Sequence, residues 1–184
     1  TMTSLASKER ILVVGNGMVG HHFVEQLHQA NENAQITVLC GESRLAYDRV
    51  HLSSYFSGAS AEDLALTDAA TYTEWGVNFV TNAMVTDILR DEKKVLTSEG
   101  QAYAYDKLIL ATGSYPFVPP IPGNNQPHCL VYRTIDDLEA IEASARESKT
   151  GVVVGGGLLG LEAANALKEA GLDTHVVEFA PQLM

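Results

Sequence analysis

Val13-Val14-Gly15-Asn16-Gly17-Met18-Val19-Gly20 and Val153-Val154-Gly155-Gly156-Gly157-Leu158-Leu159-Gly160 decide the fold, because each joins a buried strand to a helix through a glycine turn. The first glycine permits the sharp bend, the second lets a pyrophosphate approach the backbone, and the third lets the helix pack closely on the strand. The helix N-terminus adds N–H donors and the positive end of its dipole. Two such turns predict two dinucleotide sites, a combination typical of a flavin with a nicotinamide.

The residues around each turn predict a strand–helix–strand unit. Around the first turn, Ile11–Val14 and Ile36–Leu39 have the β-branched, apolar character of buried strands, and Met18–Ala30 has a helical apolar period. The second unit begins at Gly151 and extends to a strand over Thr174–Glu178. This pattern predicts an α/β fold with doubly wound, Rossmann-like domains and parallel sheets.

Between the two units the pattern changes to short strands with polar turns. Three such strands predict a β-meander: Met84–Leu89, Lys94–Thr97 and Gln101–Tyr105. A buried strand over Lys107–Leu110 follows, and a stretch with four prolines, 115–123, comes soon after it. Proline at that density resists regular structure, so it marks a crossing between domains.

We therefore expect one dinucleotide-binding domain over 1–114, a proline-rich crossover over 115–123 and the start of a second domain over 124–184. A doubly wound domain needs more parallel strands than the second unit supplies. We expect both domains to be incomplete and the chain to be a fragment truncated at its C-terminus. A truncated sheet exposes an edge and an apolar face, through which a homodimer could form.

Composition narrows the classes of partner. A net charge of -11 argues against nucleic acid and anionic membranes, since both require a basic surface. No stretch approaches the roughly 18 consecutive apolar residues of a membrane span, and the start resembles no signal peptide, so we expect a cytoplasmic protein. Cys40 and Cys129 form no Cys-x-x-Cys motif, so the sequence predicts no metal site, and we expect Cys40 to be a small buried hydrophobe.

A carboxylate at the end of the second strand, about 20 residues after the glycines, typically binds the adenosine ribose. Glu178 has this position in the second unit, and no Lys or Arg follows it, which favours NADH over NADPH. In the first unit the equivalent residue is Cys40. The nearest carboxylate there is Glu42, and Arg44 adds a donor nearby.

The order of these features resembles the FAD-dependent pyridine-nucleotide oxidoreductases: glycine turn, β-meander, Leu110-Ala111-Thr112-Gly113, proline-rich crossing and second glycine turn. Within that superfamily, three segments are similar to the large subunits of assimilatory NAD(P)H-dependent nitrite reductases: Arg44–Phe56, Ala111–Pro116 and Gly155–Ala164. The resemblance extends from about Arg10 to Met184.

This resemblance implies a set of cofactor-binding residues. For FAD they are Gly15, Gly17 and Gly20 at the pyrophosphate, Glu42 at the ribose with Arg44 beside it, Arg49, Val85, Ala111, Thr112, Gly113 and Arg133. For NADH they are Gly155, Gly157, Gly160 and Glu178. We name no catalytic residue, because direct hydride transfer requires no general base.

The resemblance further implies that NADH passes a hydride to FAD and that electrons continue to iron–sulfur and sirohaem centres, where nitrite becomes ammonia in nitrate assimilation. Those centres lie outside this chain, and a small subunit of nitrite reductase is a possible partner. Two alternatives stay open: a ferredoxin- or rubredoxin-type NADH reductase, and a fragment that binds a nucleotide without turnover. The chain offers no cysteine between Gly41 and Pro116, which argues against a cysteine-based mechanism.

Four further residues are weaker candidates. His21 and His22 follow the first glycine turn, where an imidazole could contact a phosphate, but a solvated first helical turn is the better expectation. His51 lies in the loop that would face the flavin, and Glu162 lies on the second helix near the nicotinamide in this family. A structural role is equally open for both residues.

Overall fold

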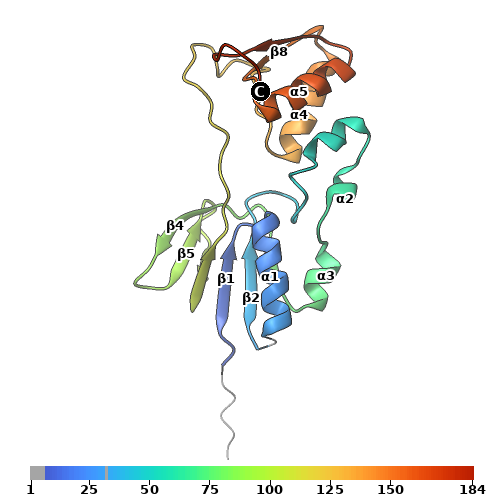
Figure 1. Ribbon diagram of the computed structural model, residues 1–184. Coiled ribbons are helices and arrows are strands. Elements are labelled where there is room, and N and C mark those ends of the chain that lie inside the picture. Colours follow the sequence, from blue (N-terminus) through green and yellow to red (C-terminus); the bar gives the residue numbers. More distant parts are fainter. Residues whose placement is uncertain (1–6, 32) are drawn as a thin grey trace, which may run out of the picture. The chain divides into compact units, whose positions relative to one another are not determined.

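The structure is a computed structural model that describes residues 7–31 and 33–184 (Figure 1). It divides into two compact units. The described residues up to Asp48, together with Ala65–Gly113, form unit 1. Arg49–Leu64 and Ser114–Met184 form unit 2. Each unit is therefore built from two separate stretches of the chain.

Unit 1 is organised around a parallel sheet with the strand order β3-β2-β1-β7. The first strand, β1 (Arg10–Val14), pairs with β2 (Gln35–Leu39) on one side and β7 (Lys107–Leu110) on the other. The edge strand β3 (Asn78–Val80) pairs with β2. Helix α1 (Met18–Ala30) connects β1 to β2. The unit is thus a βαβ fold extended by one strand on each side.

Both faces of this sheet are covered, which explains the nearly continuous apolar character of β1. Successive side chains of a strand point to opposite faces. Val13 packs among residues of α1 and α3 (Ala69–Glu74), whereas Leu12 packs against the antiparallel meander. That meander consists of β4 (Val85–Leu89), β5 (Lys94–Thr97) and β6 (Ala102–Ala104), paired in sequence order.

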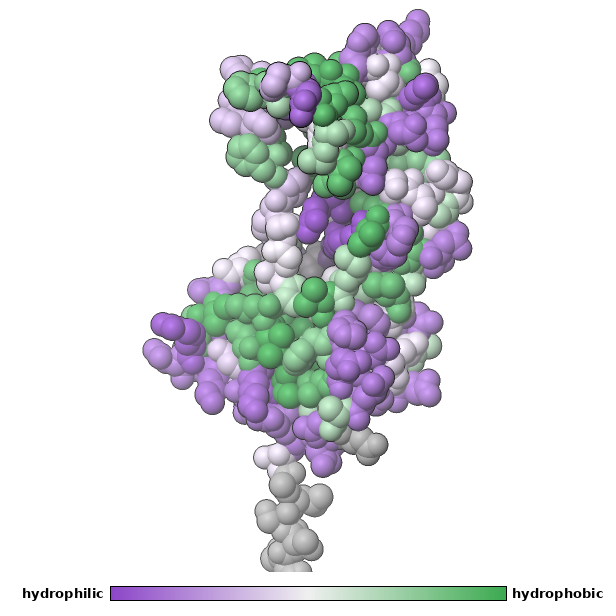
Figure 2. Space-filling view, in the orientation of Figure 1, coloured by the Kyte–Doolittle hydropathy of each residue, from purple (hydrophilic) through white to green (hydrophobic). Residues whose placement is uncertain are grey.

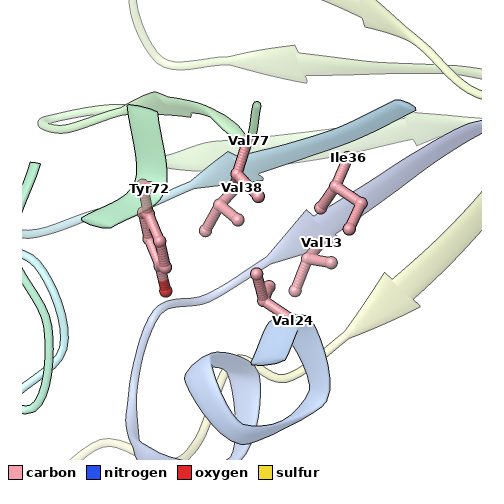
Figure 3. Close-up of a cluster of buried hydrophobic side chains, with 6 residues drawn as sticks. All are labelled: Val13, Val24, Ile36, Val38, Tyr72 and Val77. Carbon is pink, nitrogen blue, oxygen red and sulfur yellow. The ribbon is translucent and has the colours of Figure 1, made fainter. Parts of the chain in front are cut away.

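The cluster on the helical face contains six buried side chains from four elements and the turn after α3: Val13, Val24, Ile36, Val38, Tyr72 and Val77. Figure 3 shows the Tyr72 ring alongside Val38, with its hydroxyl oxygen directed toward the ribbon that leaves β1. Tyr72 is fully buried. The core of unit 1 thus brings a phenol hydroxyl close to the first glycine turn.

Unit 2 contains a second, shorter repeat of the same motif. Strand β8 (Thr150–Val154), helix α5 (Leu158–Glu169) and strand β9 (Asp173–Val177) form a parallel βαβ unit. Before it lies α4 (Ile135–Arg146), which begins with a capping box between Thr134 and Asp137. The stretch from the first half of the chain supplies a 3-10 helix, η1 (Leu52–Ser57), and α2 (Ala61–Leu64).

One face of the β8–β9 pair packs on α5, and the other is exposed. The exposed apolar side chains on and next to this face are Val152, Val154, Val177 and Phe179. Figure 2 shows a hydrophobic patch over part of the α5 region. Leu158 and Leu159, the first two residues of α5, are exposed apolar side chains as well. Two strands and one helix therefore leave much apolar surface uncovered in unit 2.

The structure confirms both predicted strand–helix–strand units and the meander. The stretch 43–58 contains one regular element, η1. The stretch 61–75 contains two short helices, α2 and α3, because Asp68 starts α3 as its N-cap, where its side chain accepts a hydrogen bond from the Thr71 N–H. Within 7–31 and 33–184, every helix falls short of the length and apolarity needed to span a bilayer.

Candidate functional site

The first glycine turn is packed so tightly that two of its three glycines cannot be replaced without movement. Gly15 has a φ of 106°, and a Cβ there would collide with the backbone carbonyl of Ala111. A Cβ at Gly20 would collide with the carbonyl oxygen of Gly15. The Gly15 N–H donates to the Leu39 carbonyl at 2.9 Å, which joins the turn to the end of β2.

Gly17 differs, because the space in front of it is open. A Cβ at Gly17 would meet no heavy atom within 4 Å. Gly17 is also the N-cap of α1, where no side chain from the described residues forms a cap hydrogen bond and the first turn carries no acidic residue. The first N–H groups of a helix have no partner within the helix. The open space and the uncapped N–H groups together fit an anionic ligand.

The second glycine turn repeats this geometry. Gly155 has a φ of 120°, and its N–H donates to the Val177 carbonyl at 2.9 Å, as Gly15 does to Leu39. A Cβ at Gly160 would collide with the Gly155 carbonyl oxygen. Gly157, the N-cap of α5, has open space in front of it, and no cap hydrogen bond comes from a side chain in the described part of the chain.

Glu178 lies directly after β9, beside this second turn. Its carboxylate accepts hydrogen bonds from the backbone N–H groups of Ala180 and Gly156. These two bonds hold the pKa of the Glu178 carboxyl below its usual value, so the group is charged at neutral pH. A negative charge at the end of this strand suits a ribose with free hydroxyls and opposes a phosphate there.

In unit 1 the residue directly after β2 is Cys40, which is buried, and its thiol donates to the Arg44 carbonyl at 3.2 Å. Glu42 lies two residues further, and its carboxylate accepts a hydrogen bond from the Tyr47 hydroxyl at 2.6 Å. The loop that carries Glu42 is also fixed to the start of the meander, since the Asn82 N–H donates to the Glu42 carbonyl at 2.9 Å.

This anchoring brings several of the expected FAD residues into one region of unit 1. The Ala83 N–H donates to the Cys40 carbonyl at 2.8 Å, two residues before Val85, the first residue of β4. On the other side of the turn, the Ala111 N–H donates to the Val14 carbonyl at 2.8 Å. Thr112 and Gly113 follow Ala111 and are exposed.

Arg49 and Arg133 belong to unit 2, and the structure brings these two residues together. The Arg49 Nη1 donates to the Arg133 carbonyl at 3.1 Å, and the Arg133 Nε donates to the Ser114 carbonyl at 3.1 Å. Both guanidinium groups therefore hold backbone segments of unit 2 in place.

A cavity of about 540 Å³ lies within unit 2 between η1 and α5. His51 and Glu162 both line it, with Ser54, Phe56 and Leu158. At its side, the Tyr132 hydroxyl donates to Glu162 at 3.4 Å, and the Tyr132 ring stacks on Phe56 at a centroid distance of 6.3 Å. Burial, together with the Glu162 charge, raises the pKa of Tyr132 to about 12.

The sequence reasoning missed a buried polar cluster next to the first turn. His21, expected in a solvated helical turn, is buried, and its Nδ1 lies 2.9 Å from the Tyr72 hydroxyl. That expectation is wrong for His21, because the helical face that carries it packs on α3, and right for His22, which is exposed. The Asn16 side chain also reaches Tyr72, at 2.8 Å.

Comparisons with known proteins agree with this geometry. The family model described as "Pyridine nucleotide-disulphide oxidoreductase" matches residues 9–184. The "Nitrite reductase (NADH) large subunit" of Escherichia coli (strain K12) is 56% identical over 97% of this chain and 21% of that protein. The "Nitrite reductase [NAD(P)H]" of Bacillus subtilis (strain 168) is 38% identical over 96% of this chain and 22% of that protein. The chain spans about a fifth of the length of these curated relatives.

Solved structures give the same fold. A ferredoxin reductase from Rhodopseudomonas palustris superimposes with a TM-score of 0.88 at 30% sequence identity, over 96% of this chain and 44% of that one. A water-forming NADH oxidase from Lactobacillus brevis, bound to NADH, superimposes with a TM-score of 0.87 at 25% identity, over 96% of this chain and 41% of that one. The predicted α/β architecture is thereby confirmed.

Proposed function

Because this chain belongs to the pyridine nucleotide-disulphide oxidoreductase family, we propose that it is the FAD- and NADH-binding part of a nitrite reductase large subunit. The observation that carries this proposal is the pair of glycine turns. In each turn a glycine with open space in front of it is the N-cap of a helix, and no side chain from the described residues caps that helix. The 56% identity to the nitrite reductase of Escherichia coli supports the choice of parent enzyme.

We assign FAD to the turn in unit 1. Its pyrophosphate would lie against Gly15–Gly20, with Gly17 offering the open approach. Glu42, with Arg44 nearby, would bind the ribose, and the chain near Val85 would contact the adenine. The hydrogen bonds that join the loop after β2 to the start of the meander support this grouping. Ala111–Gly113 would lie beside the cofactor at the other end of the turn.

We assign NADH to the turn in unit 2. Its pyrophosphate would lie at the open Gly157, and the charged Glu178 carboxylate would bind the hydroxyls of the adenosine ribose. The four residues directly after Glu178, Phe179–Gln182, include no Lys or Arg that could neutralise a 2′-phosphate. This favours NADH, and it agrees with the coenzyme in the name of the Escherichia coli relative.

The protein's own part in the reaction is binding and orientation. FAD, held at the first glycine turn, would supply the hydride-accepting chemistry. The side chains of this chain position the two nucleotides, and no side chain is required as a general base. Arg49 and Arg133, which hold backbone segments of unit 2, are assigned to flavin binding by the family resemblance.

The experiment that tests the proposal is an absorption spectrum of the purified protein after incubation with FAD and removal of the excess. We expect flavin bands near roughly 370 and 450 nm at about one flavin per chain, and bleaching on addition of NADH under anaerobic conditions. A protein that stays colourless, while its circular dichroism shows a folded α/β chain, contradicts FAD binding by these residues.

A second candidate function is a ferredoxin-type NADH reductase, favoured by the TM-score of 0.88 to the ferredoxin reductase from Rhodopseudomonas palustris. The two functions share the NADH-to-FAD step and differ in the electron acceptor. The protein produced from its native gene distinguishes them, because nitrite reductase oxidises NADH with nitrite alone. NADH oxidation that requires an added ferredoxin favours the second function.

A further inference from the structure

Three polar side chains form a buried chain of contacts in unit 1. Asn16 Nδ2 donates to the Tyr72 hydroxyl at 2.8 Å, and that hydroxyl lies 2.9 Å from His21 Nδ1. At the other end, Asn16 Oδ1 accepts from the backbone N–H of Ala46 at 2.7 Å. All three side chains are buried, with Tyr72 fully so. Such a chain in a core is costly unless every group finds its partner.

The direction of each hydrogen bond follows from chemistry. The backbone N–H of Ala46 can only donate, so Asn16 must present its oxygen there and its NH₂ to Tyr72. Tyr72 accepts that bond, and its own proton is then directed to His21 Nδ1. This is the arrangement in which each of the buried protons has an acceptor, and in it His21 is neutral, with its proton on Nε2. The three side chains are thus consistent with one protonation state.

The contacts join three parts of unit 1: the first glycine turn, the loop that carries Glu42, and α3. Asn16 lies within the turn, between Gly15 and Gly17, and Ala46 lies in the loop that carries Glu42. Tyr72 comes from α3 and is anchored in the hydrophobic core (Figure 3). The turn and the loop that follows β2 are therefore joined directly by the Asn16 amide, and the Tyr72 hydroxyl fixes the orientation of that amide.

The second turn achieves its spacing differently. Gly156 occupies the place of Asn16, and its backbone N–H donates to the Glu178 carboxylate. In unit 1 the residue equivalent to Glu178 is Cys40, which offers no carboxylate. The Asn16 side chain thus joins the first turn to the loop after β2, as the Glu178 carboxylate joins the second turn to the end of β9.

We propose that Tyr72 is a positioning residue for dinucleotide binding: through Asn16 it sets the glycine turn against the loop that carries Glu42, and a neutral His21 completes its hydrogen bonds. This inference rests on the proposed assignment of FAD to the first turn. Tyr72 itself, buried in the core, acts through Asn16 and not by contact with the ligand.

A pH dependence follows from the surroundings of His21. From its own helix it faces Glu25, which favours its charged form, and His22, which opposes it. From α3 and its C-cap it faces Tyr72 and the ring of Trp75, and that ring also contacts His28 and Tyr72. Burial, with Cys40 and Glu25, raises the pKa of Tyr72. Burial is the largest influence and lowers the pKa of His21. A proton on Nδ1 would make His21 the donor, and the buried Tyr72 O–H would then have no acceptor among the described residues.

The first experiment measures the dissociation constant for FAD against pH in the unmodified protein, Tyr72→Phe and Tyr103→Phe. Tyr103→Phe is the matched control, because its hydroxyl contacts Gln101 on the meander. At pH 7.5 we expect Tyr72→Phe to weaken FAD binding about five- to tenfold and the control to leave it unchanged. Toward pH 5 we expect binding to weaken several-fold in the unmodified protein and in the control, but not in Tyr72→Phe. Equal affinities and equal pH profiles in all three proteins overturn the proposal.

The second experiment needs no FAD, so it separates this inference from the proposed function. Nitrogen-15 NMR of the imidazoles reports which ring nitrogen of His21 carries the proton, and we expect Nε2. Amide hydrogen exchange should be faster in Tyr72→Phe over 15–20 and 41–48 and unchanged there in Tyr103→Phe. A proton on Nδ1, or unchanged exchange in Tyr72→Phe, overturns the positioning role even if FAD binds.

If Tyr72→Phe fails to fold, the unmodified protein still decides the question. We expect its amide exchange over 15–20 to accelerate as His21 becomes protonated, and the same in His22→Gln, whose imidazole is exposed. Exchange that stays constant while the His21 ring signals titrate overturns the proposal.

Discussion

The Glu178 carboxylate accepts a hydrogen bond from the backbone N–H of Gly156, so the residue that ends the second βαβ unit is joined to the turn that begins its helix. A second bond, from the Ala180 N–H at 2.8 Å, fixes the other carboxylate oxygen. The orientation of this charge is thereby set by backbone groups alone, before any ligand binds. A pre-oriented carboxylate discriminates between nucleotides more sharply than a mobile one.

The first prediction concerns coenzyme choice. In Glu178→Ala with Phe179→Arg, the negative charge is lost and a cation takes its place, and the fold tolerates the arginine because Phe179 is fully exposed. We expect NADH binding to weaken about tenfold and NADPH to become the better ligand, because a 2′-phosphate then meets a guanidinium. Fluorescence titration with both coenzymes measures this. Phe179→Leu is the control, and an unchanged preference in the double variant contradicts the assignment of Glu178.

The second prediction separates binding from folding at the open glycines. Gly17 has a φ of -85° and Gly157 a φ of -77°, which any residue adopts, and a Cβ at either meets no heavy atom within 4 Å. Gly17→Ala should therefore unfold at the same temperature as the unmodified protein. We expect it to lose FAD binding by at least tenfold, because the methyl group occupies the approach to the helix N-terminus.

Gly157→Ala is its counterpart in unit 2. It should retain FAD and lose NADH, whereas Gly17→Ala should do the reverse. Parallel titrations of both variants with both nucleotides check the pairing. A variant that loses both ligands would show that the two sites are not independent.

The third prediction concerns the packed glycine. Gly20→Ala forces a Cβ into the carbonyl oxygen of Gly15, and neither backbone segment can yield without moving α1 from β1. We expect a loss of about 1–3 kcal/mol in the free energy of unfolding. Urea denaturation followed by circular dichroism measures it, with Gly17→Ala as the control. Equal stability of the two variants contradicts the close helix–strand packing.

The fourth prediction is a pH dependence of stability. The folded protein lowers the pKa of His21, so between that value and its usual value near 6.5 the unfolded chain binds more protons than the folded chain. The contribution of neutral His21 to the free energy of unfolding should therefore be complete above about pH 6.5. The free energy of unfolding should decrease as the pH falls below that value. Denaturation midpoints across this range test it. The decrease should persist in His22→Gln and disappear in His21→Gln.

The fifth prediction concerns Tyr132. Its phenol should titrate at about pH 12, because burial and the Glu162 carboxylate both oppose the phenolate. Glu162→Gln removes the charge and should lower this pKa, while Tyr132→Phe removes the titration altogether. Ultraviolet absorbance during a rapid rise in pH measures the phenolate. A titration of Tyr132 that is unaffected by Glu162→Gln contradicts the contact between them.

Local patterns in the sequence were sufficient to predict the strand–helix–strand units. Val13 and Val153 lie in short β-branched runs followed by glycines, and these signals act over neighbouring residues. The meander was predictable for the same reason, because its strands pair in sequence order with short turns. The domain boundaries at 114 and 124 and the roles of the cofactor-binding residues stay predictions.

The buried polar chain could not be predicted in this way. His21 and Tyr72 are 51 positions apart, and only the packing of α1 and α3 on the same face of the sheet brings them together. A histidine next to a glycine turn has an ordinary solvated explanation, so nothing local marked it. The one available signal was Asn16, which stands where the second turn has glycine.

The placement of residues 49–64 in unit 2 could not be predicted from local sequence patterns either. These residues belong to unit 2, although unit 1 precedes and follows them in the chain. The residues that flank this segment lie next to each other in unit 1, because Tyr47 pairs with Ala65 and the Leu66 N–H donates to the Ala46 carbonyl at 2.9 Å. Residues 49–64 thus form a loop whose two ends lie side by side in unit 1.

The adjacency of the two ends of residues 49–64 has a consequence for recombination between related genes. A single crossover at Ser114 would give a chimera in which α5 comes from one parent and η1 from the other, so their shared cavity would be assembled from unmatched halves. A double exchange of 49–64 and 114–184 would instead transfer the cavity intact. Because the two ends of residues 49–64 lie next to each other in unit 1, related proteins can exchange this segment without disturbing the sheet of unit 1.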